Sequence, residues 1–170
     1  MEENQKAISI RKSPSADSRT AEGPVSVEEL TRSTEMHIAD VSNALRFVAN
    51  EIERRGEFHD HTKVEHMDEF QAALNCGHIK ETEWYKMHIT KERHHLKSNV
   101  PNDVNMIDVI EHVCDCVMAG MARSGQVYDV DIPPETLTLA LNNTVELLKS
   151  VTYIDQEEKI SDIMDQEVEV

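Results

Sequence analysis

Apolar side chains recur at intervals of three and four residues along several stretches of this chain. The clearest row is Ile38, Val41, Leu45, Val48 and Ile52. This spacing places the five side chains on one face of an α-helix, whereas a strand would need strict alternation. A later row, which we expect its helix to bury, is Leu137, Leu141, Val145 and Leu148. The pattern predicts an all-α fold, a single bundle of about five helices.

Capping and breaking residues set the expected ends of these helices. Ser26, with Glu29 three residues later, has the spacing of a capping box. The first helix is expected to start there, with a break near residues 31–34, and to end at Gly56. The next helices are expected at 59–75, 81–96, about 102–123 with Asn102 or Asp103 as cap, and 135–153. Residues 127–134 read as an extended link that could include a short strand.

The chain divides by composition into three parts. Residues 1–25 are rich in small and charged side chains without periodicity, so we expect a disordered arm. Residues 26–154 form the expected helical domain. Residues 155–170 carry seven acids and one lysine, which predicts either a disordered tail or a solvated continuation of the last helix.

The overall charge limits the partners that we expect. A net charge of −16 repels phosphate backbones, so nucleic acid is excluded as a general partner. No apolar run approaches the roughly 20 residues that span a bilayer, so no membrane partner is expected. Three cysteines without framework spacing suit a reducing compartment, and a cytoplasmic location is predicted. A homo-oligomer is left open.

All nine histidines lie between residues 37 and 112, and several share a helix face with acids. His37 lies at the edge of the first apolar row. His88, Glu92 and His95 share one face of the third predicted helix, with His94 beside it. Asp108, Glu111 and Asp115 form a carboxylate row on the fourth. His66, His78 and His112 are interpreted as surface residues.

Each of these residues alone has an ordinary explanation. A histidine at the edge of a core is usually satisfied by a backbone carbonyl, and an acidic row is usually a solvated face. Carboxylates that converge on a core, however, repel one another and lose hydration. A divalent cation removes both costs, and mixed nitrogen and oxygen ligands suit zinc, manganese, iron or cobalt.

The order of these residues resembles the HD-domain superfamily of metal-dependent phosphohydrolases. The chain gives His37, then the adjacent pair His59-Asp60, then His94-His95, and finally Asp115. The stretch "HDHTK" is similar to the HD-x-x-K pattern, with Lys63 as its lysine. "HITKERHH" and "IDVIEHVCDCVMAG" resemble two later helices of the superfamily. Residues 35–125 also resemble a small group of uncharacterised, phage-associated proteins; for a phage protein the expected location is the host cytoplasm.

The resemblance implies a metal-dependent phosphohydrolase that acts on a nucleotide or other small phosphoester. It implies one or two divalent ions of manganese, zinc, iron or cobalt. The implied ligands are His37, His59, Asp60, His88, His94, His95 and Asp115, with the choice among His88, His94 and His95 left open. Lys63 is expected to contact the phosphate, and Asp108 or Glu111 to orient a water or hold a histidine.

Two other functions are compatible with the same residues. A non-enzymatic interaction protein stabilised by a metal would make use of the acidic surface. A di-iron oxygenase would use the Glu-x-x-His of Glu92 and His95, although a ferritin-like site has two such motifs. Bound iron with a visible absorption band would favour the oxygenase.

Overall fold

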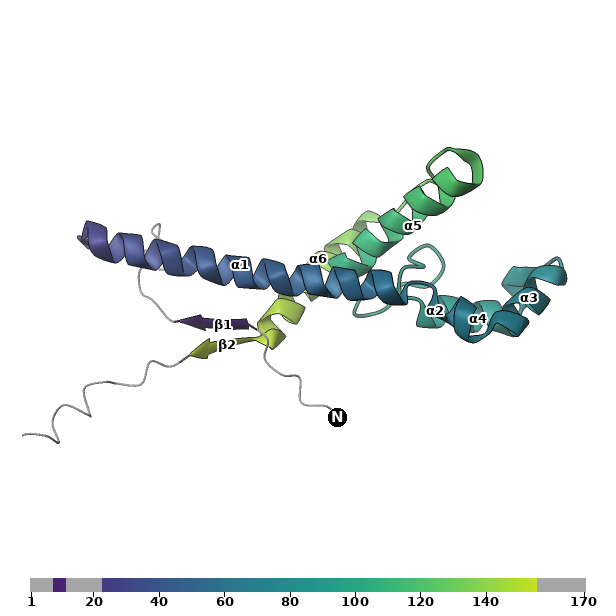
Figure 1. Ribbon diagram of the computed structural model, residues 1–170, viewed down its shortest axis with the longest axis horizontal. Coiled ribbons are helices and arrows are strands. Elements are labelled where there is room, and N and C mark those ends of the chain that lie inside the picture. The colour runs from purple at the N-terminus through teal and green to yellow at the C-terminus, as the bar shows by residue number, and fades with distance from the viewer. Residues whose placement is uncertain (1–7, 12–22, 156–170) are drawn as a thin grey trace, which may run out of the picture. The chain divides into compact units, whose positions relative to one another are not determined.

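The computed structural model describes residues 8–11 and 23–155, and most of them are helical, which confirms the all-α expectation (Figure 1). The remainder of the predicted arm and tail, residues 1–7, 12–22 and 156–170, lies outside the described residues. In chain order the elements are β1 (Ile8–Arg11), α1 (Val27–Phe58), α2 (His61–Glu65), α3 (Met67–Asn75), the 3-10 helix η1 (Ile79–Glu81), α4 (Glu83–Lys91), α5 (Met106–Ser124), α6 (Pro134–Val151) and β2 (Thr152–Asp155).

The chain forms two compact units. The central unit is Val48–Leu147, and the terminal unit combines Met1–Phe47 with Leu148–Val170. In the terminal unit β1 and β2 pair in parallel, with Ile8 opposite Thr152 and Arg11 opposite Asp155. Part of the predicted disordered arm is therefore a strand. Local periodicity could not show this, because the partner strand follows about 140 residues later and a four-residue strand has little pattern of its own.

Helix α1 is longer than its sequence signals suggested. Its start agrees with the prediction, since the Glu29 amide donates to Ser26 Oγ at 3.2 Å. The expected break at 31–34 is wrong: the Thr31 and Thr34 hydroxyls donate to backbone carbonyls one turn earlier, so the helix continues. Gly56 does not end the helix either, because α1 runs on to Phe58.

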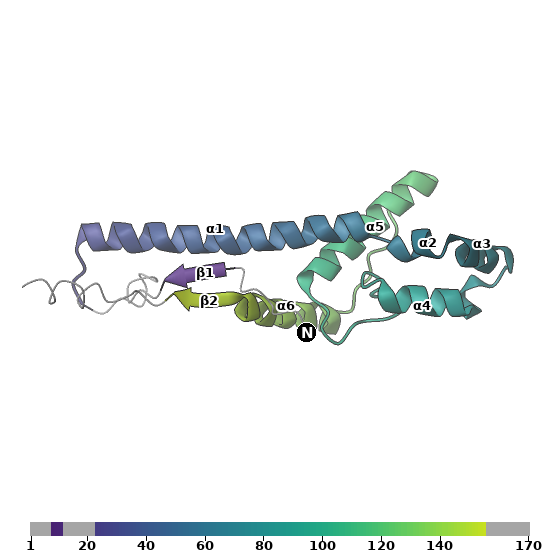
Figure 2. The ribbon, with the colours of Figure 1, turned by 60° about the horizontal axis from the view of Figure 1, so that its bottom comes forward.

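The predicted second and third helices are shorter and more divided than expected. The second is split by His66, at φ −122° and ψ 44°, into α2 and α3. The third ends at Lys91, because Glu92 takes an extended conformation. Helices α3 and α4 then lie side by side, with α2 packed against both (Figure 2). The turn after α4 carries two histidines, His94 and His95.

Helix α5 starts with a capping box that the sequence prediction placed a few residues too early. Asn105 is the cap, rather than Asn102 or Asp103, and its side chain accepts the amides of Ile107 and Asp108 while Asp108 accepts the Asn105 amide. Gly125, at φ 71°, ends the helix as predicted. Within the described chain the 127–134 link contains no strand, and α6 begins at Pro134.

The apolar core of the central unit is small. It consists of Leu96, Val104, Val109 and Ala140, with Met106 and Ile132 packed against it. Hydrogen bonds between α6 and the start of α5 border this core: Asn143 Nδ2 donates to the carbonyls of Asn102 and Val104, and the Met106 amide donates to Thr144 Oγ1.

The two apolar rows that predicted helices are not buried as rows. The later row was expected to be buried, but Leu137, Leu141 and Val145 are exposed, with Leu141 at 58 %. On α1, Ile38 is 62 % exposed. The periodicity correctly indicates which face of a helix is apolar, but it does not show that the same chain covers that face. No helix within residues 8–11 and 23–155 has both the length and the apolar character to cross a membrane.

Candidate metal centre

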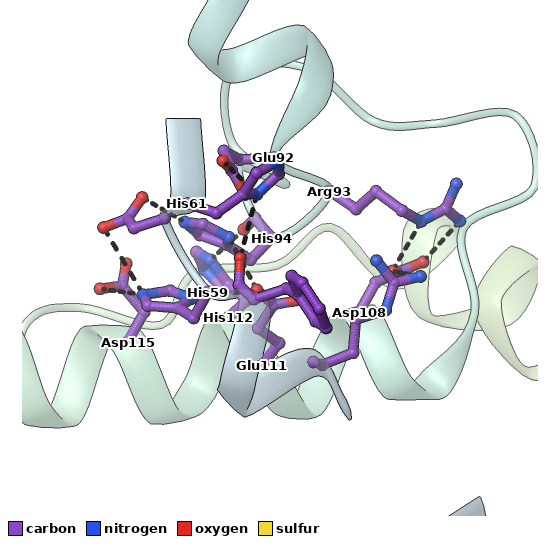
Figure 3. Close-up of polar contacts among 12 residues, drawn as sticks. His59, His61, Glu92, Arg93, His94, Asp108, Glu111, His112 and Asp115 are labelled. Carbon is purple, nitrogen blue, oxygen red and sulfur yellow. Dashed lines mark hydrogen bonds and ion pairs between the residues drawn. The ribbon is translucent and has the colours of Figure 1, made fainter. Parts of the chain in front are cut away.

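Three segments of the central unit bring imidazoles and carboxylates together (Figure 3). His59 and Asp60 follow α1 directly, and Asp60 has a φ of 55°. Aspartate tolerates this left-handed conformation better than most residues, and it lets the chain turn into α2. The other contributors are His88 of α4, His94 and His95 in the turn after α4, and Asp115 of α5. We call these six residues the histidine–carboxylate cluster.

One carboxylate oxygen of Asp60 faces two imidazole rings, and a third ring lies beside them. Asp60 Oδ1 lies 3.4 Å from His88 Nε2 and 3.7 Å from His94 Nε2. His95 Nε2 lies 2.9 Å from His88 Nε2. Both Asp60 Oδ1 and His94 Nε2 are buried without a hydrogen-bond partner among the described residues. The arrangement is costly without a further ligand, because buried polar atoms are almost always satisfied.

The other Asp60 oxygen faces the α1 and α5 side of the cluster. His59 Nε2 lies 3.6 Å from Asp60 Oδ2 and 3.6 Å from Asp115 Oδ1. The ammonium of Lys63, one turn after Asp60, donates to the same Oδ2. The two oxygens of Asp60 therefore divide the cluster into an Oδ1 side, with His88, His94 and His95, and an Oδ2 side, with His59 and Asp115.

Glu111 orients one ring on each side. Its Oε1 accepts hydrogen bonds from His59 Nδ1 and His94 Nδ1, both at 3.0 Å. These bonds place a proton on each Nδ1, so each Nε2 is turned toward Asp60, where its lone pair would bind a cation once any second proton has left the ring. Glu111 thus supports the two rings through their outer nitrogens, and its role is close to the predicted one of holding a histidine.

A second support holds His88. Thr62, which is fully buried, has its hydroxyl 2.7 Å from His88 Nδ1 and donates it to Glu92 Oε1 at 2.6 Å. The Thr62 amide also donates to Glu92 Oε1, at 2.9 Å. Because the Thr62 hydroxyl donates its hydrogen bond to Glu92, its oxygen accepts a hydrogen bond from His88 Nδ1–H. The lone pair of His88 then lies on Nε2, where it can bind a cation. Glu92 therefore supports the cluster indirectly, through its bonds to Thr62.

The electrostatics of the metal-free site reflect this crowding. Hydrogen bonds to Asp115 and Glu111 raise the pKa of His59 to about 10. Burial, then the neighbouring His94 and His88, lowers the pKa of His95 to about 4. Burial would raise the pKa of Glu111, but the hydrogen bonds from His59 and His94 outweigh it and bring the pKa to about 2. Neutral and charged imidazoles thus lie side by side. A cation that bound them would displace protons from the ring nitrogens.

The distances suit ligands of a common ion better than hydrogen bonds. Separations of 3.4–3.7 Å between carboxylate oxygen and ring nitrogen are too long for strong hydrogen bonds. Two ligands bonded to one ion at about 2.0–2.1 Å lie roughly 2.9–3.5 Å apart for ordinary bond angles, so a shared ion would draw most of these pairs closer by a few tenths of an ångström. Two groups that could hold a metal ion are His59, His94 and Glu111, and Asp60, His88 and His95.

Most of the residues predicted as ligands meet in this cluster. His59, Asp60, His88, His94, His95 and Asp115 are all members. All three later histidines lie in the cluster, and which of them would bind a metal stays a prediction. His37 belongs to the terminal unit, is exposed on α1, and is in neither metal-binding group found within the described residues.

Asp108 makes contacts of another kind. It is fully buried, and its two oxygens accept from Arg93 Nε and Nη2 at 2.8 Å each. Together with its part in the α5 capping box, these bonds make Asp108 a structural anchor between α5 and the turn after α4. Lys63, in contrast, lies at the cluster as expected, through its bond to Asp60.

Sequence patterns missed the supporting roles of three residues. His112, interpreted as a surface residue, is buried, and its Nδ1 donates to the His94 carbonyl at 2.8 Å, so it fixes the backbone of a cluster member. Thr62 matches the Ser or Thr of an HD-x-[ST]-K pattern in the phage-associated group that the chain resembles, but that pattern did not indicate its bonds to His88 and Glu92. Arg93, next to His94, could have been suspected as the partner of a buried acid, because buried carboxylates are usually paired.

No protein-family model matches this chain, and no curated protein or solved structure matches it either. The family resemblance stays a prediction, and only the geometry of the cluster bears on function.

Proposed function

We propose that this protein is a metal-dependent phosphohydrolase of the HD-domain type, acting on a nucleotide or other small phosphoester. One observation carries the proposal. Asp60 Oδ1 and His94 Nε2 are buried, face one another at 3.7 Å, and lack hydrogen-bond partners among the described residues. Such a pair is costly unless a cation joins it. A mixed set of nitrogen and oxygen donors suits manganese, zinc, iron or cobalt.

The cluster offers two positions that differ in how many donors the chain supplies. On the Oδ1 side, Asp60, His88 and His95 form one group that could hold an ion, and His94 Nε2, 3.7 Å from Asp60 Oδ1, would add the fourth donor of a closed tetrahedral site. On the Oδ2 side, His59, Asp60 and Asp115 make three, so that position keeps room for water and substrate. We therefore assign a holding role to the Oδ1 side and the reaction to the Oδ2 side, with Asp60 bridging both.

Divalent ions in such sites supply Lewis acidity and a water of lowered pKa. The chain's own residues do the rest. Lys63 lies at the Oδ2 side, where its ammonium can bind a phosphoryl oxygen as a point charge. Glu111 holds the rings of His59 and His94 in register. Asp115 is half-buried beside His59, so its carboxylate can accept a hydrogen bond from the attacking water.

The same geometry supports a second candidate, a metal-stabilised interaction protein without catalysis. The observation in its favour is the complete donor set on the Oδ1 side, since closed four-donor sites are typical of structural metals. The two functions differ on the Oδ2 side alone, where only the hydrolase requires a bound ion and an available Lys63.

The test combines metal content with phosphate release. The full chain is stripped of metal, reloaded with Mn²⁺, and assayed on a panel of nucleotides and a generic phosphodiester. We expect Asp115→Ala to keep metal on the Oδ1 side and lose turnover, and Lys63→Ala to keep all metal and lose turnover. Lys91→Ala, at an exposed position of α4, is the matched control.

The outcomes separate the candidates. A protein that binds no transition metal and gains no stability from one contradicts both functions. A protein that binds metal but leaves the whole panel intact supports the interaction protein. If Lys63→Ala strips the metal or leaves turnover unchanged, the role given to Lys63 is wrong.

A further inference from the structure

A cavity of about 280 Å³ lies against the cluster within the central unit. One wall comes from the last turns of α1 and the other from one face of α5, and three of its lining residues, His59, Glu111 and Asp115, belong to the cluster or support it. From Ile107 to Met118 the α5 wall spans roughly 16 Å at 1.5 Å per residue. Glu111 and Asp115 lie along this wall, so the cavity extends beyond the metal centre.

Most of the remaining lining is apolar. It consists of Ile52, Gly56, Ile107, Ile110, Cys114 and Met118. Met118 is 65 % exposed and Ile110 is 36 % exposed, so apolar surface is left open beside a charged centre. None of these six side chains carries a hydroxyl or an amide that could read the edge of a nucleobase.

Arg55 adds a positive charge to the lining. It lies 3.5 Å from the buried Asp108, and its Nε is buried without a hydrogen-bond partner in the part of the chain that the structure describes. Asp108 is already held by both Arg93 nitrogens. Arg55 therefore keeps its positive charge beside the α1 wall of the cavity.

We infer that this cavity binds the organic group of the phosphoester, and that this group is an apolar ring or a short alkyl chain rather than a nucleoside. The inference rests on the proposed function, whose substrate class it narrows. The phosphoryl group lies at the Oδ2 side of the cluster, and the apolar group lies against Ile110, Cys114 and Met118. The volume is at the small end for ligand pockets, which favours one ring over a base with its sugar.

Binding, rather than turnover, tests the inference. The Mn²⁺-loaded full chain is titrated calorimetrically with phenylphosphonate and with methylphosphonate, which share the anionic head and resist hydrolysis. We expect phenylphosphonate to bind at least about tenfold more tightly, because its ring removes apolar surface from water. Met118→Gln should remove most of this preference and leave methylphosphonate binding unchanged. Met121→Gln, on the same helix, half-exposed and outside the cavity lining, is the matched control.

Thiol alkylation locates the ligand. Cys114 lines the cavity and Cys76 does not, and both are exposed. Phenylphosphonate should slow alkylation of Cys114 severalfold, as followed by mass spectrometry, and leave Cys76 unchanged.

Equal affinity for the two phosphonates, no binding of either, or unprotected Cys114 would each overturn the inference. Tight binding with Cys114 protected, but no hydrolysis of any ester, supports the cavity assignment and contradicts the proposed function alone.

Discussion

The central unit has two interiors whose side chains are equally buried but chemically opposite: one is apolar and the other polar. The apolar core contains Leu96 and Val104, at 1 % and 0 % exposure. The polar interior contains His94 and Thr62, both at 0 %. The two interiors adjoin one another in sequence, since the turn after α4 supplies His94 to one and Leu96 to the other.

The two interiors are stabilised by different means. Burying Leu96 or Val104 is favourable in itself, because apolar surface leaves water. Burying His94 or Thr62 costs free energy that only hydrogen bonds, opposite charges or a cation can offset. The apolar core should therefore respond to changes of shape and volume, and the polar interior to ion pairing, metal and pH. Three predictions test this division, from the largest expected effect to the smallest, and a fourth tests the backbone packing of α1 and α5.

Removing the partner of the buried Asp108 should cost the most. Arg93→Ala removes two of the hydrogen bonds to a fully buried carboxylate and leaves it only the Asn105 amide and the more distant Arg55, so we expect a loss of about 3–5 kcal/mol in the free energy of unfolding. Urea unfolding measures it. The control is Arg54→Ala, which breaks the exposed pair with Glu51 and should cost less than about 1 kcal/mol. Equal losses in the two variants would contradict the division.

Metal should stabilise the wild-type chain and not Asp60→Asn. At an ion concentration about 100 times its dissociation constant, the gain is about 2.7 kcal/mol, a rise of roughly 5–10 °C in melting temperature. The substituted amide lacks the negative charge that both sides of the cluster share, so the rise should vanish. Scanning calorimetry with and without Mn²⁺ measures it. Asp68→Asn, exposed on α3, should keep the full rise, as should the core variant Val109→Ala.

The stability of the metal-free protein should depend on pH in both directions. The folded pKa of His95 is about 4, below the ordinary 6.5, so the unfolded chain binds the proton first and stability falls as pH drops below about 6.5. The pKa of His59 is raised to about 10, so its contribution is complete below about pH 6.5 and is lost as pH rises toward 10. Stability should therefore be greatest near pH 6.5.

Urea unfolding between pH 5 and 9.5 in chelator measures this profile. His95→Phe should flatten its acid side, while His88 and His112, whose pKa values burial also lowers, retain part of the slope. Val109→Ala should lower the whole profile without changing its form. A flat wild-type profile would show that the histidines titrate alike in the folded and unfolded chains.

Two glycine substitutions give the smallest effects and opposite signs. A Cβ on the buried Gly120 of α5 would lie 2.4 Å from the Gln126 carbonyl oxygen and 2.6 Å from the Tyr128 nitrogen. Gly120→Ala should therefore cost about 1–3 kcal/mol, since backbone must shift. Gly56→Ala, in α1 with no atom within 4 Å of the new Cβ, should stabilise by roughly 0.5–1 kcal/mol. Thermal melting compares them, and a stabilising Gly120→Ala would refute the close approach.

Local patterns anticipated much of the helical content and most cluster members, for identifiable reasons. Ser26 and Gly125 mark helix ends, because capping chemistry is local. Gly56 misled, because a glycine within a long helix costs only about 1 kcal/mol and the rest of the helix outweighs it. The split at His66 and the end of α4 at Lys91 depend on tertiary bonds such as those joining Thr62, His88 and Glu92, which leave no periodic trace.

The sequence alone placed the imidazoles and acids of this chain on helices or at their ends. It could do so because side-chain chemistry and helical periodicity are both local properties. Tertiary structure decided which of them meet. His94 and His95 lie in a turn instead of a helix, and His112 is buried. Asp108 pairs with Arg93, and Glu111 accepts hydrogen bonds from two rings. Such choices depend on distances between segments far apart in the chain, and a linear pattern contains no information about those distances.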